Sequence, residues 1–381
     1  MLDRVEAHKA GLKAHFHNLP DPRSTVNRRH LLLDIIVISI CAVVAGADGP
    51  DAIAEWAKTR KAWLGQYLEL PNGLPSKDCI RRVLMRLEPA AFQQCFGHWI
   101  DSLVGPLGAT FLNIDGKTLR RSHDKKNLLG ALHLVSVWSA ERSLTLAQIA
   151  TAEKSNEITA IPLLLDLVDV KGAIVTIDAM GCQKAIAAKI VAGKGDYVLP
   201  VKGNQGNLEQ ALEEFFDRHL EDDFARVPVS RFETEETQHG RVEKRTYMQV
   251  NVPKNFAVLK QWKGLRTLGM VIRTREINGV ETGEVQYYIS SLKRNVKTFA
   301  KAVRGHWGIE NSCHWVLDMT FREDESRIRD RSLTENMAWL RRFALGLLKR
   351  HPDVKKSQVM KRRIAGWSED FLTQVVFGVT T

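Results

Sequence analysis

Cysteine is scarce in this sequence. Five of the 381 residues are Cys, at positions 41, 79, 95, 182 and 313, and no two of them form a CxxC pair. This spacing matches neither a zinc knuckle nor a disulfide framework. We therefore expect free thiols in a reducing, cytoplasmic compartment, associated with the nucleoid if the chain binds DNA.

Long apolar runs are missing as well. The most apolar stretch, residues 31–47, contains Asp34 and is shorter than the ~20 apolar residues of a membrane span. The first thirty residues are polar and rich in His, Lys and Arg, which is not the pattern of a secretory signal. We expect a buried helix in residues 31–47 and no membrane partner.

Several catalytic motifs are absent. Gly116-Lys117-Thr118 resembles the end of a P-loop, but Phe111 occupies the position of its first glycine. No GxSxG nucleophile motif occurs. His306 and His314 are eight residues apart, whereas the HExxH motif of zinc hydrolases places its His four apart. These absences argue against a P-loop nucleotide hydrolase, a serine hydrolase and a zinc protease.

The composition is that of a basic globular protein. Hydrophobic residues make up 44% and charged residues 26%, which is enough apolar surface for a sizeable core. The net charge is +11. Excess Lys and Arg favours a polyanionic partner, because each neutralised phosphate releases counterions. Many basic proteins bind no nucleic acid, so charge alone leaves both interpretations open.

The first 105 residues predict a small helical domain that precedes the main one. Candidate helices cover residues 31–44, a segment capped by Asp51, residues 78–87 capped by Ser76, and a segment from Pro89 to about 104.

Residues 106–345 predict an α/β domain. Strand patterns at 110–114, 131–139 and 144–150 precede a helix at 157–168, and strands at 173–177 and 197–201 then alternate with helices at 183–192 and 208–219. This order implies a mixed sheet flanked by helices and is the element order of the RNase H-like fold. A β-rich insertion is expected at about 226–292, with strands at 241–250, 268–275 and 286–289 and a turn at Asn278-Gly279. Helical patterning resumes near 296, and residues 346–381 predict a basic C-terminal tail.

Two carboxylates are expected to meet at one sheet edge. Asp115 and Asp178 each end a predicted strand, and these strands are neighbours in the RNase H-like order. Adjacent carboxylates repel each other and call for a cation or a shared proton. Oxygen ligands of this kind suit Mg²⁺ or Mn²⁺. The alternative is that each Asp only caps the turn that follows it.

A third acidic residue lies in a helical pattern. His306, Glu310, His314 and Asp318 recur every four residues and would share one helix face, with Trp307 and Trp315 beside them. Such a polar stripe is costly to bury without a role. Glu310 can therefore complete a carboxylate triad.

A family resemblance follows from motifs that occur in order along nearly the whole chain. They are Asn113-Ile114-Asp115-Gly116-Lys117, Thr176-Ile177-Asp178-Ala179-Met180, Val201-Lys202-Gly203-Asn204-Gln205, His306-Trp307-Gly308-Ile309-Glu310-Asn311 with His314-Trp315 and Asp318, and Phe321-Arg322-Glu323-Asp324. Asp21-Pro22-Arg23 and Arg28-Arg29-His30 match the associated helical domain. The chain resembles insertion-sequence transposases of the DDE superfamily, in the group of the H-repeat-associated proteins.

The resemblance implies a function and a site. It implies that Asp115, Asp178 and Glu310 hold Mg²⁺ or Mn²⁺ and catalyse DNA cleavage and strand transfer. It also implies a homodimer on DNA, with terminal inverted repeats and target DNA as partners. The helical domain of residues 1–105 is then the expected reader of the element's ends. Related transposases carry Tyr, Arg and Lys at offsets that here hold Val303, His306 and Leu317. Alternatives are a transposase-derived DNA-binding protein that does not cut, and a divalent-metal nuclease that does not join.

The remaining candidates surround this triad. Predicted DNA contacts are Lys117, Lys202, His306, Trp307, Asn311, His314 and Arg322, and Asp318 is expected to support the carboxylates. Trp307 or Trp315 could stack on a base, although a Trp on an amphipathic helix is more often a core residue. Arg322, Arg327, Arg329 and Arg331 could line a DNA channel or form an exposed basic helix face.

Overall fold

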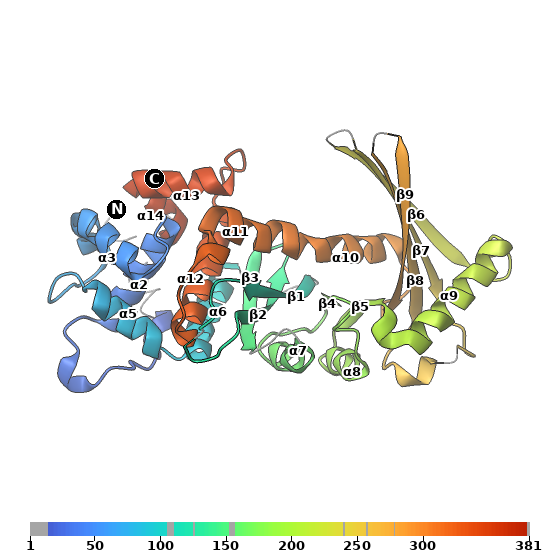
Figure 1. Cartoon of the computed structure of the whole chain (residues 1–381), viewed down its shortest axis with the longest axis horizontal. Helices are drawn as coiled ribbons and strands as arrows, with labels where there is room; N and C mark the ends of the chain where they lie inside the picture. Colours follow the sequence, from blue (N-terminus) through green and yellow to red (C-terminus); the bar gives the residue numbers. More distant parts are fainter. Residues whose placement is uncertain are drawn as a thin grey trace.

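The computed structural model describes residues 14–104, 110–124, 126–151, 157–238, 241–256, 258–277 and 279–378. Helices from both ends of the chain gather at one end of the molecule, the central sheet follows, and four long strands form the other end (Figure 1). None of the described helices is long and apolar enough to cross a membrane.

The N-terminal section is helical, as predicted. Its helices are α2 (Leu32–Val44), α3 (Pro50–Thr59), α4 (Lys61–Tyr67), α5 (Lys77–Arg86) and α6 (Pro89–Val104). Every residue of α2 from Asp34 to Val44 is buried, which confirms the buried helix. Ser76 caps α5 by accepting the N–H of Cys79, as expected. The cap predicted for α3 is wrong: α3 begins at Pro50, whose fixed φ and missing N–H suit the first helical position.

One nine-stranded sheet runs through the molecule in the order β3-β2-β1-β4-β5-β9-β8-β7-β6. The strands are β1 (Phe111–Leu119), β2 (Leu132–Ser139), β3 (Leu144–Thr151), β4 (Ile174–Ile177), β5 (Asp196–Val201), β6 (Val229–Gln238), β7 (Arg241–Asn251), β8 (Thr267–Ile277) and β9 (Val280–Ser290). β1, β2 and β3 are antiparallel neighbours, and β4 and β5 continue from β1 in parallel. This is the mixed, RNase H-like sheet that the element order predicted.

The strands β6 to β9 lie within the predicted insertion range and extend the same sheet, because β9 pairs with β5. β6 was not predicted, since its Glu-rich sequence lacks an apolar run. Gly279 has the positive φ of a hairpin turn, and Asn278 lies outside the described residues.

Helices cover both faces of the sheet. The helices α7 (Glu157–Asp166), α8 (Lys184–Ala192) and α9 (Gly206–Glu221) share a core with one face, which includes Leu112 and Ile114 of β1. The helix α10 (Val296–Ile309) packs on the opposite face, where Phe299 meets Phe111 and Val198 in another core cluster. β1 therefore presents its alternate residues to two different helical layers.

The predicted basic tail is not a free tail. The helices α12 (Arg331–Arg350), α13 (Gln358–Trp367) and α14 (Glu369–Phe377) share one apolar core with the N-terminal helices. Lys361 and Arg362 are buried. Lys361 Nζ donates to the carbonyl of Leu348 at 3.0 Å, and Arg362 Nη1 donates to the carbonyl of Thr320 at 2.6 Å. These cations donate hydrogen bonds to backbone carbonyls near helix ends, and they therefore stabilise the fold.

Candidate active site

The register of β1 and β4 brings two aspartates together. Ile114 lies opposite Ile177 as the last pair of this parallel ladder, so Asp115 and Asp178 are the next residues on adjacent strands. The prediction that Asp115 ends its strand is wrong. β1 continues to Leu119 because it pairs with β2 over this range. Only the ladder with β4 stops at Ile114, which leaves both carboxylates at the point where the two strands part.

Glu310 comes from the helix that crosses the same face. α10 passes without a break into a π-helical turn, η5 (Glu310–His314), and then into α11 (Trp315–Phe321), forming one long helix (Figure 1). A π turn accommodates an extra residue in the helix and occurs often at functional sites. Asp115, Asp178 and Glu310 all line a single cavity of about 630 Å³.

The cavity concentrates negative charge around Asp115. Burial, together with the neighbouring charges of Asp178, Glu157 and Glu310, raises the pKa of Asp115 to about 7. Nδ1 of His314 lies 3.5 Å from Asp115 Oδ2. Burial lowers the pKa of His314 to about 3, so this ring is neutral at pH 7 and the contact is not an ion pair. Asp115 therefore has neighbouring carboxylates and an uncharged imidazole around it.

The other face of β1 is tightly packed at Gly116, the residue after Asp115. A Cβ atom at position 116 would lie 2.5 Å from both Glu157 Oε1 and His133 Nε2, so only glycine fits there. His133 and Glu157 are both buried and lie 2.6 Å apart. The backbone that carries Asp115 is thus packed from behind by a buried polar pair.

Asp178 has a second contact. Its Oδ1 accepts the backbone N–H of Gly181 at 3.0 Å, so the turn-capping alternative holds in the structure alongside its place in the cavity wall.

His306 and Trp307 lie where α10 reaches the cavity. Thr176 Oγ1 accepts a hydrogen bond from Nδ2 of Asn113 at 2.7 Å. The same oxygen lies 3.1 Å from Nδ1 of His306. Burial lowers the pKa of His306 to about 4, which leaves a neutral ring. Trp307 is 48% exposed and lines the cavity, and Trp315, outside it, is 60% exposed. The alternative that these two Trp belong to the core is wrong.

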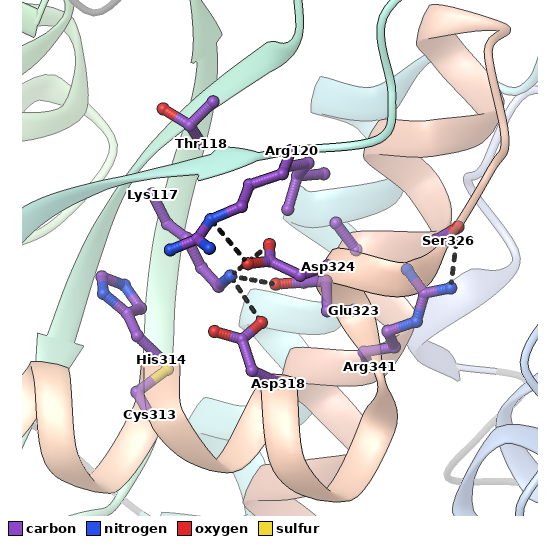
Figure 2. A network of polar contacts seen from close by, with 12 residues as sticks. Lys117, Thr118, Arg120, Cys313, His314, Asp318, Glu323, Asp324, Ser326 and Arg341 are labelled. Carbon is purple, nitrogen blue, oxygen red and sulfur yellow. Dashed lines mark hydrogen bonds and ion pairs between the residues drawn. The ribbon is translucent and has the colours of Figure 1, made fainter.

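Lys117 occupies a different environment from the one predicted. Its side chain is buried, and Nζ lies 2.7 Å from Asp318 Oδ1 and 3.0 Å from Asp324 Oδ1. Figure 2 shows Lys117 pointing into this acidic group, with Arg120 beside it. Nε of Arg120 lies 3.2 Å from Asp324 Oδ2. Lys117 is not a cavity residue, and its predicted DNA contact is corrected to an internal ion pair, because three carboxylates surround the ammonium.

Glu323 is the third carboxylate of this group. It is buried with Arg342, whose Nη1 lies 2.8 Å away, and its Oε2 lies 3.9 Å from Lys117 Nζ. The Phe321-Arg322-Glu323-Asp324 motif contains two of the three carboxylates around Lys117. The sequence did not predict that these carboxylates pair with Lys117.

The other candidates divide between the cavity wall and other surroundings. Lys202 and Asn311 are exposed and line the cavity. His314 is buried beneath Asp115, which rules out its predicted direct contact with DNA in this conformation. Arg322 is exposed, lies outside the cavity wall and donates from Nε to Glu325 at 2.9 Å. Arg327 and Arg329 are exposed, and Arg331 Nη2 donates to the carbonyl of Gly130 at 2.7 Å.

Sequence reasoning missed the arginines that line the same cavity. These are Arg241 and Arg245 of β7, Arg273 and Arg275 of β8, and Arg304 of α10. They interleave with Glu236, Glu243 and Glu284, so that Arg304 lies 2.8 Å from Glu236 and Arg273 pairs with Glu284. Alternate residues of a strand share a face, so the spacing of the β7 and β8 arginines was a usable signal.

The donor set fits a hard divalent cation. Carboxylate oxygens from three separate segments line one cavity, and the charge around Asp115 is that of a site completed by a cation. Among the described residues, no three His, Cys, Asp or Glu side chains are close enough together to hold a metal ion. Binding would therefore draw the carboxylates closer than they lie in this conformation.

Comparison with known proteins agrees with the motifs. Residues 106–347 match the family described as Transposase DDE domain, and residues 13–100 match the family described as DDE_Tnp_1-associated. YncI of Escherichia coli O157:H7 is 41% identical over 362 residues, covering 94% of this chain and 92% of that protein. The H repeat-associated protein YhhI of Escherichia coli K12 is 39% identical over 372 residues, covering 96% and 98%.

A solved structure of the piggyBac transposase synaptic complex with hairpin DNA covers 98% of this chain and 78% of its own. Its identity is 13% and its TM-score 0.41, a distant likeness from which nothing about function follows. The family match spans more than half of the chain, and the two curated relatives align over nearly their whole lengths. The chain belongs to the DDE transposase family.

Proposed function

We propose that this protein cuts DNA at the ends of a mobile element and joins the freed 3′-OH ends to target DNA. The observation that carries the proposal is the convergence of Asp115, Asp178 and Glu310 on one cavity whose wall is also rich in arginine. The carboxylates can hold cations, and the arginines can bind the phosphates of a polyanion.

Asp115, Asp178 and Glu310 would hold Mg²⁺ or Mn²⁺. Two such ions, when bound, activate the attacking oxygen and stabilise the leaving oxygen of a phosphodiester. Asp115 would hold a cation beside the other two carboxylates, because the charges of Asp178 and Glu310 act on it. In the first step water attacks the phosphorus and the bond to the 3′ oxygen breaks, which leaves a 3′-OH and a 5′-phosphate. In the second step that 3′-OH attacks a target phosphodiester in line and displaces its 3′ oxygen.

Other residues would bind and orient the DNA. Lys202 and Asn311 line the cavity and can donate to backbone phosphates. Thr176, held by Asn113, orients the neutral ring of His306 toward the cavity. The exposed Trp307 can stack on a base that leaves the duplex at the cut site.

The test is a combined cleavage and strand-transfer assay on DNA that carries the ends flanking this gene, with Mg²⁺ or Mn²⁺. The native chain is compared with Asp178→Ala and with Glu221→Gln, a control on the exposed end of α9. We expect cutting and joining by the native chain and the control, and a loss of at least about 10²-fold in the Asp178 variant.

Other outcomes identify the alternatives. Metal-dependent cutting without any joining would indicate a nuclease. DNA binding without cutting, unchanged by Asp178→Ala, would indicate a transposase-derived DNA-binding protein.

A further inference from the structure

A basic helix face lies far from the cavity, in the N-terminal section. Four exposed cations follow one side of α5: Lys77, Arg81, Arg82 and Arg86. The opposite side of α5 buries Ile80, Val83 and Leu84. Asp78 is the one acidic residue on the exposed side, so this face carries a clear positive excess.

The buried side fixes α5 to the rest of the molecule. Ser76 caps its first turn, and the side-chain amide of Asn336 on α12 donates to the carbonyls of Leu84 and Leu87 at 2.8 and 3.0 Å. α12 also packs against β3 of the central sheet. The position of α5 is therefore set relative to the domain that carries the carboxylates.

A second basic segment is tied beside α5. Arg23 forms a two-pronged contact with Asp21 at 2.9 and 2.8 Å, and Arg28 donates to the carbonyl of Arg23 at 2.8 Å. The Asn72 side chain donates to the carbonyl of Arg29 at 2.5 Å, just ahead of α5. These contacts give the Asp21-Pro22-Arg23 motif a structural role, which is to hold the exposed Arg28 and Arg29 in place.

The two basic segments meet along one side of α5. The Arg23 side chain lies near the Cys79 side chain of α5. Arg82 and Arg86 follow Cys79 by three and seven residues, so they lie on the same side of the helix. Among the described residues, Arg29, Arg82 and Arg86 make no ion pair, whereas Lys77 pairs with Asp51 and Arg81 with Asp78.

We propose that α5, with the adjoining Arg28 and Arg29, is a duplex-DNA-binding surface that reads the end of the element. Its ten residues span about 15 Å at 1.5 Å per residue, and a helix about 10–12 Å in diameter fits a major groove about 12 Å wide. Arg82 and Arg86 reach base edges, and Arg28 and Arg29 contact the flanking phosphates. That the partner is DNA rests on the proposed function, whereas the surface itself rests on the contacts above.

The experiment measures binding without catalysis. Full-length protein is titrated in EDTA against labelled duplex carrying the flanking ends and against a scrambled duplex, over a range of salt concentrations. The proteins are the native chain, Arg82→Ala/Arg86→Ala and the control Lys260→Ala/Lys263→Ala. The last pair removes the same charge from exposed positions between β7 and β8.

The surface predicts a selective loss. Arg82→Ala/Arg86→Ala should bind the end duplex at least about tenfold more weakly, lose its preference over the scrambled duplex, and show a salt slope smaller by about two. The control pair should bind within about twofold of the native chain. Native-like melting of the α5 variant would show that it is folded.

Two results would overturn the surface: native affinity of the folded α5 variant for the end duplex, or an equal loss for end and scrambled duplexes. Failure of the proposed function is distinguishable, because it would appear as uncut DNA in the presence of metal while binding in EDTA remained sensitive to Arg82 and Arg86.

Discussion

Lys117 of β1 places its ammonium 2.7 Å from Oδ1 of Asp318 on α11. Four residues before Asp318, His314 contacts Asp115, which lies two residues before Lys117. Two residues of a strand rise about 6.6 Å and four residues of a helix about 6 Å, so strand and helix meet in matching steps. This pairing fixes the helix that carries Glu310 against the strand that carries Asp115.

Removing the ammonium of Lys117 should loosen that junction. In Lys117→Met, the carboxylates of Asp318, Glu323 and Asp324 lose their shared cation, and we expect a loss of about 2–4 kcal/mol in the free energy of unfolding. Lys117→Arg should recover part of it, and Lys126→Met, at an exposed position, should change little. Urea denaturation measures all three. Native stability of Lys117→Met would show that the pair does not hold the junction.

Glu335 gives a pH dependence that is independent of the cavity. Burial and then the charge of Glu88 raise the pKa of Glu335 from 4.5 to about 7. The folded chain therefore resists ionising this group, and its contribution to stability falls as pH rises from 4.5 to 7 and stays constant above. Glu335→Gln should be more stable than the native chain by about 1–3 kcal/mol at pH 8, and equal to it at pH 4. Unfolding curves at the two pH values test this, and a difference independent of pH would contradict it.

Gly116 should not accept a side chain. In Gly116→Ala the new methyl would meet Glu157 and His133 at 2.5 Å, behind the backbone of Asp115. We expect a loss of about 1–3 kcal/mol in stability together with slower DNA cleavage, because the strand must shift. Gly283→Ala is the matched control in β9, since nothing lies within 4 Å of its added Cβ. Thermal unfolding of both variants decides the point, and equal melting temperatures would refute the close packing.

The arginines that line the cavity should determine the affinity of the protein for DNA. Arg241 and Arg275 are each 3.8 Å from Glu243 and line the same cavity as Asp115, Asp178 and Glu310. Arg241→Ala/Arg275→Ala should raise KM for end DNA about tenfold and reduce the salt dependence of binding, with a smaller effect on kcat. Arg226→Ala, at a site that is 88% exposed, serves as control. An unchanged KM would mean that the DNA does not follow this part of the cavity wall.

Period and element order predicted much of this molecule. Local sequence patterns predicted the strand before Asp178 and the helix that carries His306, Glu310, His314 and Asp318. In the structure His306, His314 and Asp318 contact residues of the sheet, and Glu310 lines the cavity. The burial of Lys117 was not predictable, because its partners lie about 200 residues away.

Two other features could not be predicted from the local sequence. The π turn from Glu310 to His314 has no marker in the sequence and shifts the face that each later residue presents. Arg362 looks like part of a basic tail, yet it is buried because carbonyls of Val43, Ala47 and Thr320 receive its donors. For Arg362, as for Lys117, distant segments decide the environment of the charge.

The most direct test of the proposed site is the strand-transfer rate of Asp115→Asn, Asp178→Asn and Glu310→Gln, singly and combined. If the three carboxylates act as one metal-holding unit, each single variant should lose at least about 10²-fold, and the triple variant should lose little more than the worst single one. A Glu310→Gln variant that joins DNA at the native rate, while both Asp variants fail, would contradict the triad.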